Sequence, residues 1–202
     1  PVAVFGFQDF SVKPRKLSRE LRGYRRWLLG QGPKPVAVPP EYHVADLSVF
    51  LRARGMRDVR VIDLFDPRAD CRYDMNHPVP AEEHERYGTF MDIGSLEHVF
   101  DTRQCLENEL RMVRPGGVYM VMTPVCGYRG HGLHTFHPDV LVQALEINGF
   151  EILYCQYGTK HGVRVSRPAP GEDALIWLVG RKRAPLDKFE IPQQQAFWEE
   201  FY

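Results

Sequence analysis

The sequence predicts an α/β fold, with a mostly parallel sheet covered by helices on both faces. Short apolar runs bounded by Gly and Pro alternate with amphipathic segments of about 10–15 residues along most of the chain. Parallel strands need long crossover connections, and helical segments between apolar runs supply them. The 202 residues, 44% of them hydrophobic, also suffice for one substantial core.

The first part of the chain is expected to begin with an extended or irregular lead-in, residues 1–14. Residues 17–29 follow as a helix, because apolar positions recur there at helical spacing. Its other face is mostly basic, and we interpret it either as a solvated face or as a lid that meets an anionic group of the substrate. The next expected elements are a strand at 35–38, a helix at 45–54 and strands at 58–66 and 71–75.

The second part is expected to continue the alternation. A strand at 87–95 leads to a helix at 99–113, which "RPGG" ends, and then to a strongly apolar strand at 118–125. A further helix starts near Pro138 and ends before Gly149. Two last strands, 151–158 and 174–182, have no helix between them. We therefore expect them to form an antiparallel pair at one edge of the sheet.

Charge and cysteine content exclude several classes of protein. The formal net charge is zero, so no overall field favours nucleic acid or a membrane as partner. No apolar run approaches the roughly 18 residues that span a bilayer, and the N-terminal residues lack the features of a signal peptide. The four cysteines are far apart and never form a CxxC pair, so we expect reduced thiols and a cytoplasmic protein.

Three phrases follow one another in the second half: "MDIGSLEHVFD" (91–101), "LENELRMVRPGGVYMVMTP" (106–124) and "FHPDVLVQALEINGFEI" (136–152). Their order and spacing resemble class I S-adenosylmethionine (SAM)-dependent methyltransferases, over about residues 59–182. "RYDMNHPVP" and "GHGLHTFHPDVL" are similar to phrases from the group of that family that acts on sugars, polysaccharides and natural products.

The resemblance implies a Rossmann-like class I methyltransferase fold. Its sheet has seven strands and is mostly parallel, with helices on both faces and an antiparallel edge strand. The resemblance also implies SAM as cofactor, bound across the carboxyl ends of the strands. The implied reaction is methyl transfer to oxygen or nitrogen of a small-molecule acceptor, a sugar or a natural-product intermediate.

Residues that bind the cofactor are also implied by the resemblance. Asp63 stands where the family places the acid that binds the ribose hydroxyls, with Asp66 as the alternative, and a carboxylate accepts from two vicinal hydroxyls at once. Asp74 stands where an acid approaches the adenine amino group, and the end of the strand at 87–95 passes the methionine part. The full set implied is Asp63, Leu64, Asp74, Met75, Ile93, Gly94 and Ser95.

The segment "KPVAVPPEYHV" (34–44) departs from the family, which has a glycine-rich loop at this point. No glycine occurs between Gly32 and Gly55, and proline has no N–H to donate to a ligand. We interpret the segment as a rebuilt cofactor site. The alternative hypothesis is a methyltransferase fold that has lost methyl transfer and serves as a binding or partner subunit, or that runs a different reaction. The cofactor-binding residues expected here are Val38, Glu41 and Tyr42.

Proton transfer from the acceptor needs a base, and histidine suits that role near neutral pH. His98 is expected to contact the acceptor, with Glu97 as its support. The loop after residue 125 adds His131, His134 and His137, of which His131 and His134 are candidates for binding the acceptor or for catalysis. Their regular spacing also fits a metal site, but no carboxylate accompanies them, and we expect no metal.

The chain is expected to comprise an N-terminal extension, residues 1–33, a methyltransferase-like domain, residues 34–183, and an aromatic tail, residues 184–202. The tail either packs back on the domain or forms an interface, because its exposed aromatic side chains would otherwise make an apolar patch. A homo-oligomer, or a partner protein that completes the pocket, is left open.

Overall fold

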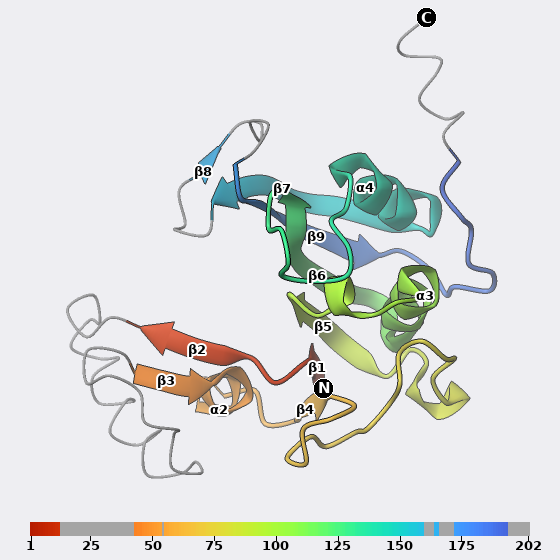
Figure 1. Ribbon diagram of the computed structural model, residues 1–202. Coiled ribbons are helices and arrows are strands. Elements are labelled where there is room, and N and C mark those ends of the chain that lie inside the picture. The colour runs from red at the N-terminus through yellow and green to blue at the C-terminus, as the bar shows by residue number, and fades with distance from the viewer. Residues whose placement is uncertain (13–42, 54, 160–163, 166–171, 194–202) are drawn as a thin grey trace, which may run out of the picture. The chain divides into compact units, whose positions relative to one another are not determined.

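A computed structural model of the chain describes residues 1–12, 43–53, 55–159, 164–165 and 172–193 (Figure 1). The chain divides into two compact units, residues 1–73 and residues 74–202. The predicted helix at 17–29 and the predicted strand at 35–38 lie outside the described residues.

The first unit contains a parallel pair of strands, β1 (Val2–Phe5) and β4 (Val59–Ile62), with Val2 opposite Val59 and Phe5 opposite Ile62. Ala3, Val4 and Ile62 are at most 1% exposed, so these runs form a core. Of the two expected forms of the lead-in, residues 2–5 take the extended one, as a strand paired with β4. The predicted strand at 71–75 is reduced to a single parallel bridge between Cys71 and Ile62.

Two further elements complete the described part of this unit. Strands β2 (Asp9–Val12) and β3 (His43–Asp46) pair antiparallel, and β3 runs directly into helix α2 (Leu47–Ala53). Leu47 and Leu51 are spaced one helical turn apart, and both are buried. The helix predicted at 45–54 is therefore confirmed with slightly shorter bounds.

The second unit contains a mixed sheet in the order β5-β6-β9-β7-β8 (Figure 1). Strands β5 and β6 are parallel, whereas the pairs β6/β9, β9/β7 and β7/β8 are antiparallel. The strand bounds are β5 Tyr87–Ile93, β6 Val113–Cys126, β7 Phe150–Thr159, β8 Arg164–Val165 and β9 Ala174–Lys182.

The predicted sheet is only partly confirmed. Strands β7 and β9 do form the expected antiparallel pair, but β9 lies inside the sheet, between β6 and β7. Its composition explains this position, because Ile176 and Leu178 are fully buried, whereas β7 exposes Leu153 and Tyr154 at 42% and 43%. The expectation that the antiparallel strand lies at the edge is wrong for β9. A seven-stranded, mostly parallel sheet stays a prediction.

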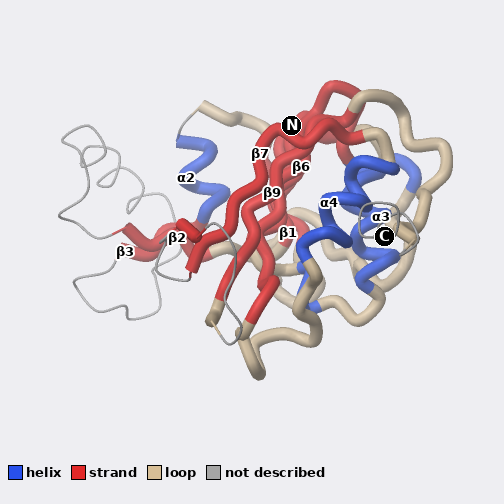
Figure 2. The backbone as a smooth tube through the Cα atoms, turned by 90° about the horizontal axis from the view of Figure 1, so that it is seen from above, coloured by secondary structure: helices blue, strands red, loops and turns tan. Residues whose placement is uncertain are grey.

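Two α-helices of this unit pack on the same face of the sheet (Figure 2). Helix α3 (Thr102–Met112) begins at Asp101, whose carboxylate accepts from the N–H of Gln104, and α4 (Pro138–Ile147) starts with its proline. A Cβ at Gly180 of β9 would lie 2.8 Å from Leu145 Cδ2, so α4 approaches the sheet closely there. Within the described part of this unit, these helices cover one face rather than both.

Residues 186–190 of the C-terminal segment pack against both helices. Arg111 Nη1 donates to the carbonyl of Leu186, Asn148 Nδ2 donates to the carbonyl of Glu190, and Phe189 is 6% exposed. The part of the tail beyond residue 193 lies outside the described residues. The three-part division of the chain stays a prediction. Strand β1, which belongs to the expected N-terminal extension, pairs with β4 of the expected domain. In the described part of the chain, no helix is long and apolar enough to cross a membrane.

Candidate functional site

The turn after β5 is built on a buried carboxylate. Asp92 is 0% exposed, and it accepts from the N–H of Ser95 (2.8 Å) and of Leu96 (3.0 Å). Gly94, between them, has φ of +85°, a conformation that favours glycine. This turn passes directly into the short 3₁₀ helix η3 (Leu96–His98). The functional candidates Glu97 and His98 are therefore held at the carboxyl end of β5.

Glu97 is buried, with 1% exposure, and is connected to both neighbouring segments. Its Oε2 accepts from the hydroxyl of Thr123 on β6 (2.9 Å), and its Oε1 lies 3.6 Å from His131 Nε2. Because β5 and β6 are parallel, their carboxyl ends meet at one edge of the sheet. Glu97, Thr123 and His131 gather at that edge.

The loop at residues 131–134 is fastened to the backbone of Glu97. The N–H groups of Leu133 (2.8 Å) and His134 (3.1 Å) both donate to the Glu97 carbonyl. At Gly132 a Cβ would lie 2.9 Å from Glu97 Cγ and from its carbonyl oxygen, so only glycine fits without a shift. This close approach holds His131 beside the Glu97 carboxylate. The supporting role expected for Glu97 stays a prediction.

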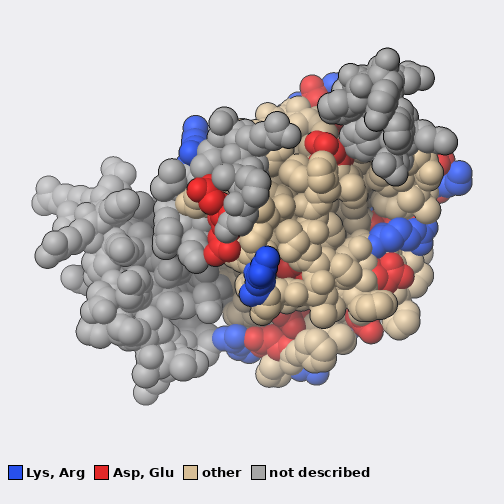
Figure 3. All heavy atoms as spheres, turned by 45° about the horizontal axis from the view of Figure 1, so that its top comes forward, with Lys and Arg blue, Asp and Glu red and all other residues tan. Residues whose placement is uncertain are grey.

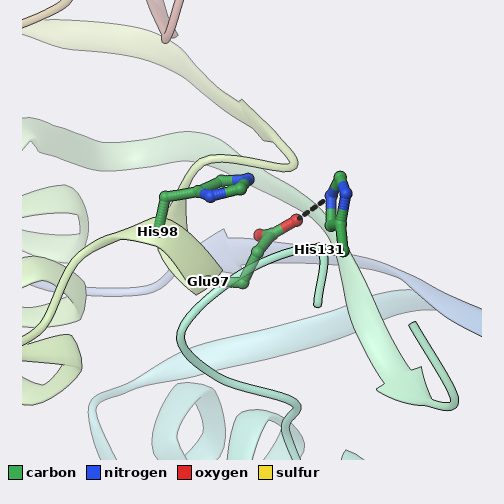
Figure 4. Close-up of side chains that lie close together, drawn as sticks. All are labelled: Glu97, His98 and His131. Atoms are coloured by element: carbon green, nitrogen blue, oxygen red, sulfur yellow. Dashed lines mark ion pairs between the residues drawn. The ribbon is translucent and has the colours of Figure 1, made fainter. Parts of the chain in front are cut away.

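His98 completes a cluster with Glu97 and His131, as Figure 4 shows. The ligand atoms of the three side chains all lie within 4.8 Å of one another, and the two imidazole rings are 5.1 Å apart in an edge-to-face arrangement. Both histidines are exposed, whereas Glu97 lies below them in the protein. The cluster therefore presents two imidazoles to solvent above a buried carboxylate.

The other two histidines of the loop point elsewhere. His134 Nε2 lies 3.1 Å from the carbonyl of Phe100, and its ring packs between those of Phe100 and Phe136. His137 is the N-cap of α4, with Nδ1 3.4 Å from Asp139 Oδ2. The regular spacing of His131, His134 and His137 does not bring these three side chains together as one ligand set.

A second group of acids lies inside the protein, beneath this edge. Burial raises the pKa of Asp92 to about 7, and the charge of Glu97 acts in the same direction. Burial and the charge of Asp92 hold the pKa of Glu109 well above its usual range, and these two carboxyls share a hydrogen bond. The hydroxyl of Tyr119 donates to Glu109 Oε2. At least one proton is therefore shared between Asp92 and Glu109 near neutral pH.

In the first unit, Asp63 stands at the carboxyl end of β4 beside the end of β1. Its Oδ2 accepts from the N–H of Phe7 (3.2 Å), and its Oδ1 accepts from Phe65 (2.8 Å) and Asp66 (3.0 Å). A carboxylate has about four acceptor positions, so the contacts with described residues leave one position on Oδ2. Gly6, with φ of +74°, makes the turn after β1.

The remaining predicted cofactor residues differ in their polar partners and in their exposure to solvent. Asp66, the alternative to Asp63, is paired with Arg68, which lowers its pKa to about 2. Asp74 accepts from both nitrogens of Asn76, which lowers its pKa, and Met75 is 2% exposed. Leu64 is 37% exposed. Val38, Glu41 and Tyr42 lie outside the described residues.

Sequence reasoning missed four residues of these sites. Asp92 and Thr123 could have been found by alternation, because each lies two residues beyond a buried strand position, Phe90 and Val121 respectively. Gly6 and Gly132 carried a weaker signal, because a single glycine in a loop has many structural roles. The residues missed are Gly6, Asp92, Thr123 and Gly132.

A cavity in the second unit is formed by other residues than the three of the cluster. It measures 740 Å³ and is formed by α3, α4 and residues 189–193, with Leu96, Leu106 and Phe136 among the side chains around it. Glu97, His98 and His131 do not line it. Most of the exposed surface inside the cavity is apolar.

No protein-family model matches the chain, and no curated protein matches its sequence. Solved structures do resemble it. The [4+2]-cyclase SpnF has 19% identity over 68% of this chain and 62% of its own, at a TM-score of 0.43. The N-methyltransferase NodS of Bradyrhizobium japonicum, in complex with S-adenosylhomocysteine (SAH), has 14% identity over 67% of this chain and 72% of its own, at 0.45.

A third similar structure is the 1,6-didemethyltoxoflavin-N1-methyltransferase of Burkholderia thailandensis, with bound SAH. It has 19% identity over 90% of this chain and 71% of its own, at a TM-score of 0.41. The chain spans less than two thirds of the length of SpnF, 62%. At these identities and TM-scores, a function for this chain rests on its own residues.

Proposed function

We propose that the chain is a SAM-dependent methyltransferase that acts on oxygen or nitrogen of a small-molecule acceptor, a sugar or a natural-product intermediate. The observation that carries the proposal is the cluster of Glu97, His98 and His131 at the carboxyl ends of the parallel strands β5 and β6. In open α/β sheets this is the edge at which ligands bind. The sequence phrases that resemble the class I methyltransferases include this same segment.

His131 is the proposed general base. Its Nε2 lies on the side of the Glu97 carboxylate, 3.6 Å from Oε1, and Nδ1 is the ring nitrogen left to accept a proton from the acceptor. Glu97 positions the ring and stabilises the imidazolium that forms. His98 is proposed to contact the acceptor, because its exposed ring stands beside that of His131. His134 remains a weaker candidate, since it faces Phe100.

SAM, when bound, supplies an electrophilic methyl group on a sulfonium. In residues 74–202, the segment Ile93–Ser95 fits a close approach of this cofactor, because a Cβ on Gly94 would meet only Glu97 Oε1, at 3.3 Å. In residues 1–73, Asp63 fits a ribose hydroxyl with its remaining acceptor position. Asp74, Met75 and Leu64 keep the roles proposed from the resemblance, as do Val38, Glu41 and Tyr42.

A small acceptor is favoured over nucleic acid by the distribution of charge. On the face that Figure 3 shows, basic and acidic side chains of the described residues are interspersed, so no basic patch there suits a phosphate backbone.

The four cysteines, Cys71, Cys105, Cys126 and Cys155, are all free thiols, which suits a cytoplasmic protein. A homo-oligomer or partner protein stays part of the proposal as an alternative.

The first prediction tests cofactor binding through Asp63. Asp63→Asn keeps a side-chain oxygen for the turn but removes acceptor capacity, so SAH should bind about tenfold more weakly, a loss of about 1.4 kcal/mol by calorimetry. Asp66→Asn is the matched control, because Asp66 is already paired with Arg68 and is expected to leave SAH affinity unchanged.

Two results would contradict the proposal. Absence of SAM and SAH binding by the folded wild-type protein would favour the alternative, a methyltransferase fold that binds a partner or runs another reaction. Equal losses for Asp63→Asn and Asp66→Asn would leave Asp63 without its assigned role. Turnover on a panel of sugar and natural-product acceptors then decides between oxygen and nitrogen.

A further inference from the structure

We propose that Glu97, His98 and His131 form a binding site for one divalent transition-metal ion. Two imidazoles and one carboxylate are a ligand set that proteins use for zinc and for other first-row divalent ions. The three ligand atoms already lie within 4.8 Å of one another. This inference goes beyond the methyltransferase proposal, and it does not depend on it, since ion binding needs neither cofactor nor acceptor.

The distances suit an ion with little rearrangement. Two ligand atoms at about 2.1 Å from a tetrahedral zinc ion lie about 3.4 Å apart. Glu97 Oε1 and His131 Nε2 are 3.6 Å apart, longer than a hydrogen bond but close to that ligand spacing. The exposed His98 side chain is the one that needs to move, and as an exposed side chain it can change rotamer readily.

The negative charge of the Glu97 carboxylate also favours a cation at the cluster. Glu97 is 1% exposed, and in the described part of the chain neither Lys nor Arg pairs with it. The basic group beside Glu97 is His131, which carries a positive charge only when protonated. A buried carboxylate beside a neutral partner is costly, and proteins resolve this with a proton, a cationic partner or a metal. Neutral histidines supply lone pairs rather than charge, so a divalent ion balances the carboxylate while using both rings as ligands.

The surroundings hold the buried ligand in one position, as metal sites require. Thr123 donates to Glu97 Oε2 and leaves Oε1 toward the histidines, and the contacts at the Glu97 carbonyl fix the loop that bears His131. Such outer contacts orient the ligands of metal sites. With three protein ligands, further coordination positions remain for water or for an oxygen of a bound molecule.

The chemistry of the ligands selects the kind of ion. Magnesium and calcium prefer oxygen ligands, and two of the three atoms here are imidazole nitrogens. Zinc and cobalt accept this mixture, and cobalt reports its coordination by visible absorption. We therefore name Zn²⁺ and Co²⁺ as probes, and we expect Mg²⁺ in millimolar excess not to displace either ion.

The test measures Zn²⁺ binding by the full chain, after removal of metals, in competition with a chromophoric chelator. The wild-type protein should bind one equivalent, and His98→Ala and His131→Ala should each raise the Kd at least about tenfold. Thr123→Val removes only the outer hydrogen bond and should weaken binding to a smaller degree. His77→Ala is the matched control: His77 is exposed, it stands 3.8 Å from a carboxylate oxygen of Asp74, and it lies outside the cluster.

Circular dichroism confirms that each variant is folded before its Kd is compared. Co²⁺ absorption that disappears in His131→Ala but persists in His77→Ala would support the site. Zinc affinity that is the same in all variants, or full displacement by Mg²⁺, would overturn the proposal. SAH calorimetry on the same samples is independent of the ion, so a failed metal site and a failed methyltransferase proposal are distinguished.

Discussion

At the scale of single residues, Gly132 decides where His131 stands. Its lack of a side chain lets the loop lie against Glu97, and the N–H groups of Leu133 and His134 can then reach the Glu97 carbonyl. The chemistry of the cluster therefore depends on a residue that takes no part in it. The sequence marks this glycine only as one of several in a loop, so its role follows from the packing alone.

Gly132→Ala tests that dependence. Because the new Cβ would come within 2.9 Å of Glu97, we expect the loop to move away and the protein to lose about 1–3 kcal/mol of its free energy of unfolding. Trypsin should cleave faster after the exposed Arg129. Thr135→Ala, a change of similar size at an exposed position of the same loop, is the control. Equal proteolysis rates in both variants would show that Gly132 does not hold the loop.

At the scale of elements, β9 is the strand on which the second sheet depends. It pairs with β6 on one side and β7 on the other, and its even-numbered residues are buried, whereas Trp177 on the opposite face is 42% exposed. The predicted bounds, 174–182, agree with the structure. Its place inside the sheet was not predicted, because an apolar run shows that a strand is buried and not which neighbours it has.

Substitutions of two neighbouring residues in β9 test which face of the strand is buried, because their side chains lie on opposite faces of the sheet. Leu178→Ala removes a fully buried side chain and should cost about 2–5 kcal/mol of unfolding free energy in urea. Trp177→Ala removes a larger side chain from the partly exposed face and is expected to cost clearly less. If the two losses were equal, the assignment of the buried face would be wrong.

At the scale of the whole molecule, the sequence located most elements but not all of their partners. The tetrapeptide Pro-Val-Ala-Val occurs at residues 1–4 and again at 35–38, and sequence analysis chose the second copy as a strand. The structure pairs the first copy with β4, beside Asp63. The pairing of the first copy depends on long-range contacts, which a single sequence does not contain. The second copy lies outside the described residues, so the strand expected there stays a prediction.

The residues of the candidate site were likewise predictable where local sequence decides their position, and not where long-range contacts decide it. The position of Glu97 and His98 after β5 was predictable, because strand ends and the motif that follows them can be read along the chain. The inclusion of His131 and the exclusion of His134 depend on a loop conformation that a hydrogen bond to Phe100 and a glycine contact determine. The spacing of His131, His134 and His137 offered a trio of ligands, which the sequence analysis rejected because no carboxylate accompanies it. The fold instead brings together two histidines and a glutamate.

The buried acids make the stability of the whole molecule depend on pH. The pKa of Asp92 is raised from 3.8 to about 7, so between these values the folded protein keeps a proton that the unfolded chain releases. Stability from this group is therefore fully present below about pH 4, decreases as the pH rises, and levels off above about pH 7. Because Asp92 and Glu109 share the proton, this pH dependence belongs to the pair of carboxyls.

Asp92→Asn removes this titration, because an amide stays neutral. The free energy of unfolding of the variant, minus that of the wild type, should increase from pH 4 to pH 7 in urea titrations, on top of a constant cost for one lost hydrogen bond. Asp74→Asn is the control with the opposite sign, since hydrogen bonds from Asn76 lower the pKa of Asp74, and that stability is lost as the pH falls. A difference for Asp92→Asn that does not change with pH would mean that this carboxyl is charged in the folded protein, and the shared proton with Glu109 would have to be abandoned.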